Sequence, residues 1–137
     1  MFDVEAAQLL LDRSPFGPWW GFVVRAVEPG LARVDLPARP ELFRPGGVLQ
    51  GGCAMTLADV TCWIAVLAAT SADSPAVTLH QSSTFLAAAR TGLSCESSLV
   101  RSGRTVHYGT ASTWDSAGTL ISHHTITYLR PGNPPPS

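Results

Sequence analysis

A single aspartate interrupts the longest apolar stretch of the chain. Between residues 53 and 69 the only polar side chains are Thr56, Asp59 and Thr61. On a helix the side chains three and four positions from Asp59 would be its neighbours, and none of them is charged. Burying an unpaired carboxylate is costly, so Asp59 is a candidate for general base or nucleophile. The alternative is a structural aspartate that caps a loop or pairs with an arginine from elsewhere.

A pair of glycines at the start of this stretch provides a second chemical group. A helix that begins at Gly51 and Gly52 leaves backbone N–H groups without intrahelical partners and open to a ligand. The positive end of the helix dipole favours negative charge at the same place. The Gly51 amide could therefore stabilise the oxyanion that forms when an acyl carbonyl is attacked.

The spacing of these two groups constrains how they can act. Eight positions separate Gly51 from Asp59, which is about 12 Å along a helix axis. One small acyl carbonyl cannot contact both groups of a single chain. We therefore predict a two-fold homodimer with antiparallel central helices, which would form two equivalent sites at its interface.

The remaining elements must hold this helix. We expect a short helix over residues 2–12, in an N-terminal segment that spans residues 1–13. Two strands follow over 19–27 and 31–36, and then the apolar helix over about 51–69. Four more strands are expected over 76–87, 93–101, 105–115 and 120–129. A helix that is apolar nearly all round must be covered on most sides. Four consecutive strands joined by short turns can do this. We predict one α+β domain over residues 1–137, a curved antiparallel sheet around one long helix, with a frayed Pro-rich tail at 131–137.

Composition excludes several classes of protein. Hydrophobic residues make up 45% of the 137 residues, and the formal net charge is −1, which argues against disorder and against a nucleic-acid partner. Three cysteines without zinc-ligand spacing predict buried thiols and no metal. The apolar helix carries a carboxylate and is shorter than a membrane span, so we expect no membrane partner. The acidic N-terminus favours a cytoplasmic location.

The segment GGVLQGGCAMTLADVTCWIA resembles the G-x-x-H-G-G-x-x-x-x-L-x-D motif of the PaaI-like hotdog-fold acyl-CoA thioesterases, within the 4-hydroxybenzoyl-CoA thioesterase superfamily. The likeness extends from about residue 31 to residue 130. It implies a hotdog fold, a homodimer commonly paired into a dimer of dimers, and hydrolysis of acyl-CoA. Coenzyme A would be part of the substrate, and no separate cofactor is implied.

The resemblance also implies roles for individual residues. Asp59 would act as general base or nucleophile, and the Gly51 amide would polarise the thioester carbonyl. Gly52, the next residue, would form part of the substrate-binding site. Thr78, on the strand after the helix, would position water or the carboxylate. Arg104, which follows the turn glycine Gly103, would lie near the phosphates of coenzyme A.

Two residues depart from the family pattern. Gln50 replaces the usual histidine before Gly-Gly, and its amide can still orient the thioester through a hydrogen bond. Arg44 replaces a frequent asparagine and adds a fixed charge. It could pair with Asp59, meet an acidic acyl chain, or bind a phosphate of coenzyme A.

Further candidates flank these groups. His80 is two residues beyond Thr78 on the same predicted strand face and could line the cleft, and Trp63 is one helical turn beyond Asp59. Arg90 and Arg101 stand near turns, as Arg104 does, and are either solvated or ligands of the phosphates. Trp19, Trp20 and Phe22 could cover an acyl pocket or pack in the core.

Two other functions fit the same sequence. The first is a non-catalytic acyl-CoA-binding or regulatory module, which the changes at Arg44 and Gln50 favour. The second is a hotdog dehydratase or hydratase, which would pair a histidine with the acid. The loop over residues 37–50 contains no histidine, so the hydrolase is the preferred interpretation.

Overall fold

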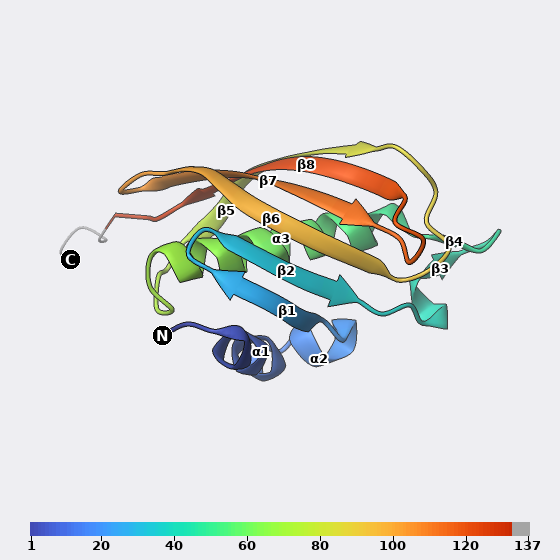
Figure 1. Cartoon of the computed structure of the whole chain (residues 1–137), viewed down its shortest axis with the longest axis horizontal. Coiled ribbons are helices and arrows are strands. Elements are labelled where there is room, and N and C mark those ends of the chain that lie inside the picture. Colours follow the sequence, from blue (N-terminus) through green and yellow to red (C-terminus); the bar gives the residue numbers. More distant parts are fainter. Residues whose placement is uncertain (133–137) are drawn as a thin grey trace, which may run out of the picture.

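One antiparallel sheet curves around one long helix in the computed structural model, which describes residues 1–132 (Figure 1). Its strands are β1 (Val23–Glu28), β2 (Leu31–Leu36), β5 (Val77–Phe85), β6 (Leu93–Ser102), β7 (Val106–Trp114) and β8 (Leu120–Leu129). They pair in the order β1-β2-β6-β7-β8-β5. The predicted α+β architecture is confirmed. Of the predicted tail, only residues 131 and 132 are among the described residues.

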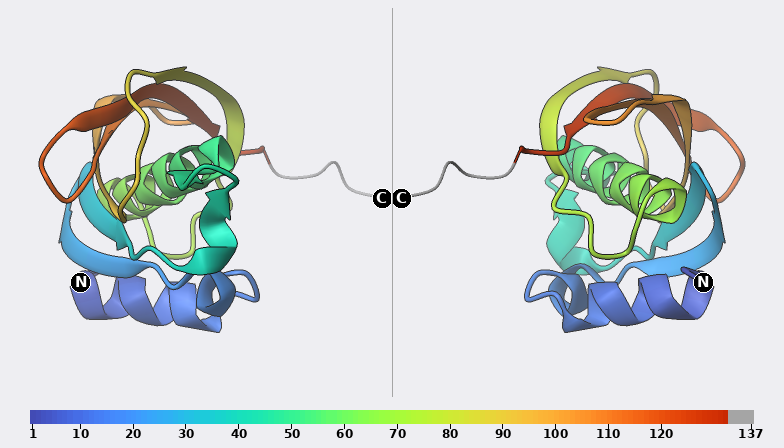
Figure 2. Two further views of the ribbon diagram at one scale, coloured as in Figure 1. Left: turned by 90° about the vertical axis from the view of Figure 1, so that its right-hand side faces the viewer. Right: turned by 90° about the vertical axis from the view of Figure 1, so that its left-hand side faces the viewer.

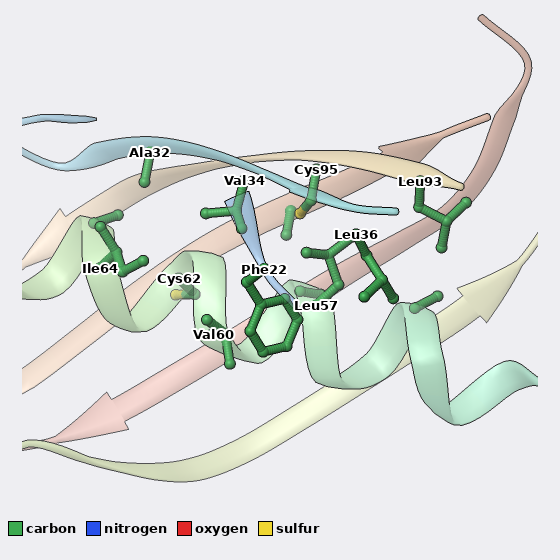
Figure 3. Packing of buried hydrophobic residues seen from close by; sticks show 14 of the residues in the cluster. Phe22, Ala32, Val34, Leu36, Leu57, Val60, Cys62, Ile64, Leu93 and Cys95 are labelled. Atoms are coloured by element: carbon green, nitrogen blue, oxygen red, sulfur yellow. The ribbon is translucent and has the colours of Figure 1, made fainter. Parts of the chain in front are cut away.

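The central helix α3 (Gly51–Ala69) has the predicted bounds. It begins at Gly51 because Gln50 is extended, and it ends where the Thr70 N–H donates to the Val66 and Leu67 carbonyls. Eleven of its 19 residues are buried. Figure 3 shows Leu57 and Ile64 of α3 packed beneath β2 and β6. Although α3 is long and apolar enough to cross a membrane, this burial is that of a core helix.

The connection between β5 and β6 differs from the expected short turn. β5 pairs with β8 at the far edge of the sheet, so residues 86–92 cross the end of the sheet to reach β6. The Leu86 N–H donates to the Ile121 carbonyl at 2.7 Å, and the Leu49 N–H donates to the Ala89 carbonyl at 2.8 Å. The end-on views in Figure 2 show why this order is favourable, because the sheet thereby arches over α3.

The N-terminal region also differs from expectation. Helix α1 (Val4–Arg13) is capped by the Asp3 side chain, as a short helix there requires. Trp19 and Trp20 lie in a second short helix, α2 (Gly17–Trp20), and not in a strand. Pro18 suits the first turn of a helix, and Gly21, with a φ of 73°, ends it in the left-handed conformation.

The segment expected to be an open loop before α3 contains short elements. A 3-10 turn covers Pro40–Leu42, and strands β3 (Phe43–Arg44) and β4 (Val48–Leu49) form a two-stranded hairpin. The Gln50 N–H donates to the Leu42 carbonyl at 2.9 Å, which fixes the approach of the chain to the helix. The hairpin therefore positions the N-terminus of α3.

Truncating Ile64 tests the packing around α3. Its side chain is fully buried, so Ile64→Ala should lower the free energy of unfolding by about 2–5 kcal/mol through lost burial and a residual cavity. Urea denaturation measures this. Leu9→Ala, at an exposed position of α1, is the control and should change it by about 0.5 kcal/mol or less. Equal effects of the two variants would contradict the packing described.

Candidate active site

Asp59 is held by hydroxyl groups from two strands. The Thr78 Oγ1 of β5 donates to Asp59 Oδ1 at 2.7 Å, and the Tyr128 hydroxyl of β8 lies 2.7 Å from the same oxygen. The Tyr128 hydroxyl is also 3.0 Å from the Asp59 carbonyl oxygen. The sequence-based expectation of a buried, unpaired carboxylate is therefore wrong, since Asp59 is partly exposed and has two partners. No pattern in the sequence linked Tyr128 to Asp59.

These contacts leave Asp59 able to react. Burial, and then the negative charge of Asp59, raise the pKa of Tyr128, so its phenol stays neutral and acts as a hydrogen-bond donor. Both hydroxyls meet Oδ1, and no side chain or backbone group of residues 1–132 donates to Oδ2. One carboxylate oxygen is thus anchored, while the other can accept a proton from water or attack a carbonyl carbon.

Asp59 opens into a pocket of about 310 Å³, which we call the acid pocket. The residues that line it are Phe16, Asp59, Val60, Trp63, Ala76, Val77, Thr78 and Tyr128. Trp63 and Thr78 lie here, as the sequence suggested. Phe16, which comes from the chain before α2, was not foreseen, because nothing local in the sequence connects it with α3.

His80 does not share a face with Thr78. Thr78 pairs with Tyr128 and His80 with Thr127, so Leu79 forms a bulge between them. Because the bulge adds one residue, the side-chain alternation shifts and His80 faces away from Thr78 and Asp59. The prediction that His80 lines the cleft beside Thr78 and Asp59 of the same chain is therefore wrong.

The N-terminus of α3 lies in a second pocket of about 390 Å³, the amide pocket. Its polar lining groups come from Arg44, Gln50 and Gly51, and its other lining residues are apolar. The Gln50 side chain folds over Gly52, where its Oε1 is 2.7 Å from the position that a Cβ would occupy. A side chain at Gly52 would displace Gln50, so Gly52 keeps the amide of Gln50 at this end of the helix.

The two pockets share no lining residue. The Gly51 amide and the Asp59 carboxylate are separated by eight residues of continuous helix, about 12 Å along its axis. Each chain therefore carries two separate halves of the chemistry that an acyl transfer reaction needs.

The candidate arginines lie at both ends of the molecule. Arg44 lines the amide pocket and, within residues 1–132, makes no ion pair with Asp59. Arg90 lies beside this pocket, where its Nη1 donates to the Gly46 carbonyl at 2.9 Å. Arg101 and Arg104 lie around the β6–β7 turn at the other end of the sheet (Figure 1). Arg104 lines a pocket there together with Arg130.

No described histidine or cysteine lines the acid pocket or the amide pocket. His124 faces the core, and its Nδ1 and Nε2 hydrogen-bond to Ser83 and Ser122 at 2.7 and 2.8 Å. Burial raises the pKa of the Cys62 thiol to about 11 and that of Cys95 to about 12, so both stay protonated. Among the residues that the structure describes, no group of three His, Cys, Asp or Glu side chains could hold a metal ion.

Comparisons with known proteins agree with this geometry. The family model described as thioesterase superfamily matches residues 46–122. A Thermoplasma acidophilum protein, provisionally named an esterase, is 27% identical over 129 residues, which cover 93% of this chain and 97% of that protein.

Solved structures share the fold. A Haemophilus influenzae thioesterase superposes with a TM-score of 0.85 at 18% identity, over 94% of this chain and 90% of its own. Zebra fish thioesterase superfamily member 2 superposes with a TM-score of 0.83 at 20% identity, over 93% and 98% of the two chains. At these identities the likeness shows the hotdog arrangement of sheet and helix.

The buried His124 should make stability depend on pH. Burial, and then the charge of His123, lower its pKa from 6.5 to about 4, so the unfolded chain binds a proton in this range before the folded chain does. The stability contributed by neutral His124 is complete above about pH 6.5 and is lost as the pH falls towards 4. Urea midpoints across this range should fall more steeply for the wild type than for His124→Gln. Equal slopes would contradict the assignment.

Proposed function

The chain belongs to the thioesterase superfamily, and we propose that it hydrolyses acyl-CoA thioesters to the free acid and coenzyme A. Family membership and the esterase and thioesterase relatives support hydrolysis of a thioester as the class of reaction. The observation that carries the specific proposal is Asp59, which lines the acid pocket, accepts hydrogen bonds from Thr78 and Tyr128 on Oδ1, and accepts none on Oδ2 from residues 1–132.

The proposed reaction uses Asp59 and the Gly51 amide together. As general base, Asp59 accepts a proton from water while the water oxygen attacks the thioester carbonyl carbon. The Gly51 N–H stabilises the oxyanion, and the Gln50 amide orients the thioester. The C–S bond then breaks, and the leaving sulfur takes up the proton from Asp59. If Asp59 instead attacks directly, water hydrolyses the resulting anhydride to the same products.

A shared site requires a second copy of the chain. We propose a two-fold dimer in which antiparallel α3 helices place Gly51 of one protomer beside Asp59 of its partner. Support comes from the side of the molecule around β5, an edge strand with one free edge. Exposed apolar side chains gather on β5 and near it, namely Met55, Val77, Leu79, Phe85 and Leu86. A dimer of dimers and a cytoplasmic location stay predictions.

Coenzyme A needs cationic partners for its phosphates. Arg44 and Arg90 at the amide pocket, and Arg101 and Arg104 at the other end of the sheet, are the arginines that we propose for this role. None of the described arginines lines the acid pocket. The phosphates would therefore bind outside it.

Two alternatives remain distinguishable. A binding module would take up acyl-CoA without releasing thiol, and Arg44 and Gln50 are the residues that favour it. A dehydratase would need a histidine at the acid, and no described histidine lines either pocket. Thiol release from a panel of acyl-CoA substrates separates hydrolysis from binding.

Replacing Asp59 tests its chemistry. Asp59→Asn keeps the shape and should lower kcat/KM by about 10²–10⁴-fold, because the base or nucleophile is lost. The assay is release of free thiol from acyl-CoA. Asp12→Asn, the same change on the exposed face of α1, should leave the rate unchanged. An Asp59→Asn variant as fast as the wild type would refute the site.

Replacing Gly51 tests the oxyanion role. Proline suits the first position of a helix, and the extended Gln50 (ψ 135°) tolerates a following proline. Gly51→Pro therefore removes the N–H with little disturbance and should lower kcat by about 10²–10³-fold. Gly51→Ala keeps the N–H, and its Cβ would lie 3.6 Å from the Phe85 ring, an ordinary contact. It should remain active, and equal losses in both variants would count against the amide.

The same variants test the shared site. A mixed dimer, purified through different tags on Asp59→Asn and Gly51→Pro chains, carries both defects in one site and neither in the other. Its activity should be about half that of the wild type, since one of two equivalent sites is intact. A mixed dimer as inactive as its parents would show that both residues act within one chain.

A further inference from the structure

Phe16 reaches the acid pocket from outside the sheet and helix. It lies between α1 and α2, which pack below β1 in the end-on views of Figure 2. Its ring lines the same pocket as Asp59 and is 40% exposed. A ring with this exposure contributes little to the core, but as part of the pocket lining it can contact a bound apolar ligand.

The backbone around Phe16 is firmly held. Residues 14–21, which we call the N-terminal corner, contain Pro15 and Pro18, whose rings restrict φ. A side chain at Gly17 would overlap the carbonyl oxygen of Leu11, so only glycine allows this close approach to α1. The Gly17 N–H donates to the Ser14 carbonyl at 3.0 Å, and the Trp20 N–H donates to the Phe16 carbonyl at 3.3 Å.

Aromatic packing fixes the corner against the rest of the molecule. The Trp20 ring stacks on Phe22, with centroids 5.8 Å apart, and Phe22 is buried in the core. The Arg39 guanidinium lies 4.3 Å from the centroid of the Trp19 ring, within the range of a cation–π interaction. The backbone that carries Phe16 is therefore fixed against the rest of the molecule.

Trp63 lines the same pocket from α3. It is four residues beyond Asp59, about 6 Å further along the helix axis. Its indole is partly buried and packs against the core, so it cannot easily turn aside. An acyl group that extends from Asp59 along the helix meets Trp63 within one turn.

The charge and size of the acid pocket indicate which part of the substrate it takes. Its lining contains no Arg, Lys, His or Glu, its polar side chains are those of Asp59, Thr78 and Tyr128, and its other walls are aromatic or small and apolar. The phosphates of coenzyme A would meet no cation in the acid pocket, whereas an apolar acyl group would meet apolar side chains. In one chain, without the partner protomer of the proposed dimer, its volume is about 310 Å³, within the range of about 300–1,000 Å³ for small-molecule pockets.

We propose that Phe16 and Trp63 are the specificity-determining walls of the acyl site, and that they select compact apolar acyl groups over long chains. The N-terminal corner is then the part of the chain that sets substrate range. This inference rests on the proposed function, because it assigns the acid pocket to the acyl group of the thioester.

The test compares acyl-chain lengths in the full-length protein. Thiol release is measured from butanoyl-, octanoyl- and dodecanoyl-CoA for the wild type, Phe16→Ala and Leu9→Ala. The wild type should prefer the shorter chains. Phe16→Ala should raise the dodecanoyl to butanoyl ratio of kcat/KM by about 10–100-fold, since pocket contacts of this size discriminate to that extent. Leu9, similarly exposed on α1, does not line the pocket, and Leu9→Ala should keep the wild-type ratio.

Binding of S-alkyl-CoA thioethers of the same lengths, measured by calorimetry, separates this inference from the hydrolysis itself. These analogues cannot be cleaved, so they report the walls of the pocket even if the protein releases no thiol. Phe16→Ala should tighten binding of the dodecyl relative to the butyl thioether, and Trp63→Leu should shift the preference in the same direction. An unchanged preference in both assays would overturn the role of Phe16, while thiol release by the wild type would still support the proposed function.

Discussion

The requirement that α3 be covered by protein on most of its surface governs this structure. The helix is apolar over nearly its whole length, and an isolated helix of that kind would expose far more apolar area than water tolerates. Six strands curve around it, and β5 reaches the far edge of the sheet so that the cover extends on both sides. The one face left open carries Met55 and Asp59. The same constraint that builds the core therefore decides where chemistry can occur.

Polar groups near that face serve two different purposes. Thr78 and Tyr128 join the strands to Asp59 and prepare its carboxylate, because two hydroxyl donors on one oxygen hold the charge in place. His124 and its serine partners form a satisfied network inside the sheet, and burial keeps that histidine neutral. Titratable residue types alone do not distinguish these purposes. Access to the acid pocket does, because Asp59, Thr78 and Tyr128 line it whereas His124 and its serine partners do not.

The N-terminal corner shows how a common fold acquires an individual site. The arrangement of sheet and helix is shared with structures at identities of only 18–20%. Residues 14–21 precede the sheet and place an aromatic ring beside Asp59 in the acid pocket. Function on a given fold is decided by such local additions, because the core itself is constrained by packing.

The sequence by itself determined the elements whose signals are local. The bounds of α3, β2 and β8, and the sheet wrapped around one helix, follow from hydrophobic periodicity and turn residues. Helix geometry and residue type made Asp59 and Gly51 candidates for the site. The tertiary structure alone decided the pairing of β5 with β8, the bulge that turns His80 away, and the contacts of Tyr128 and Phe16 with the acid pocket. Periodicity reports which face of an element is buried. It does not report which distant element covers that face or in which register, because those depend on long-range pairings that no local pattern encodes.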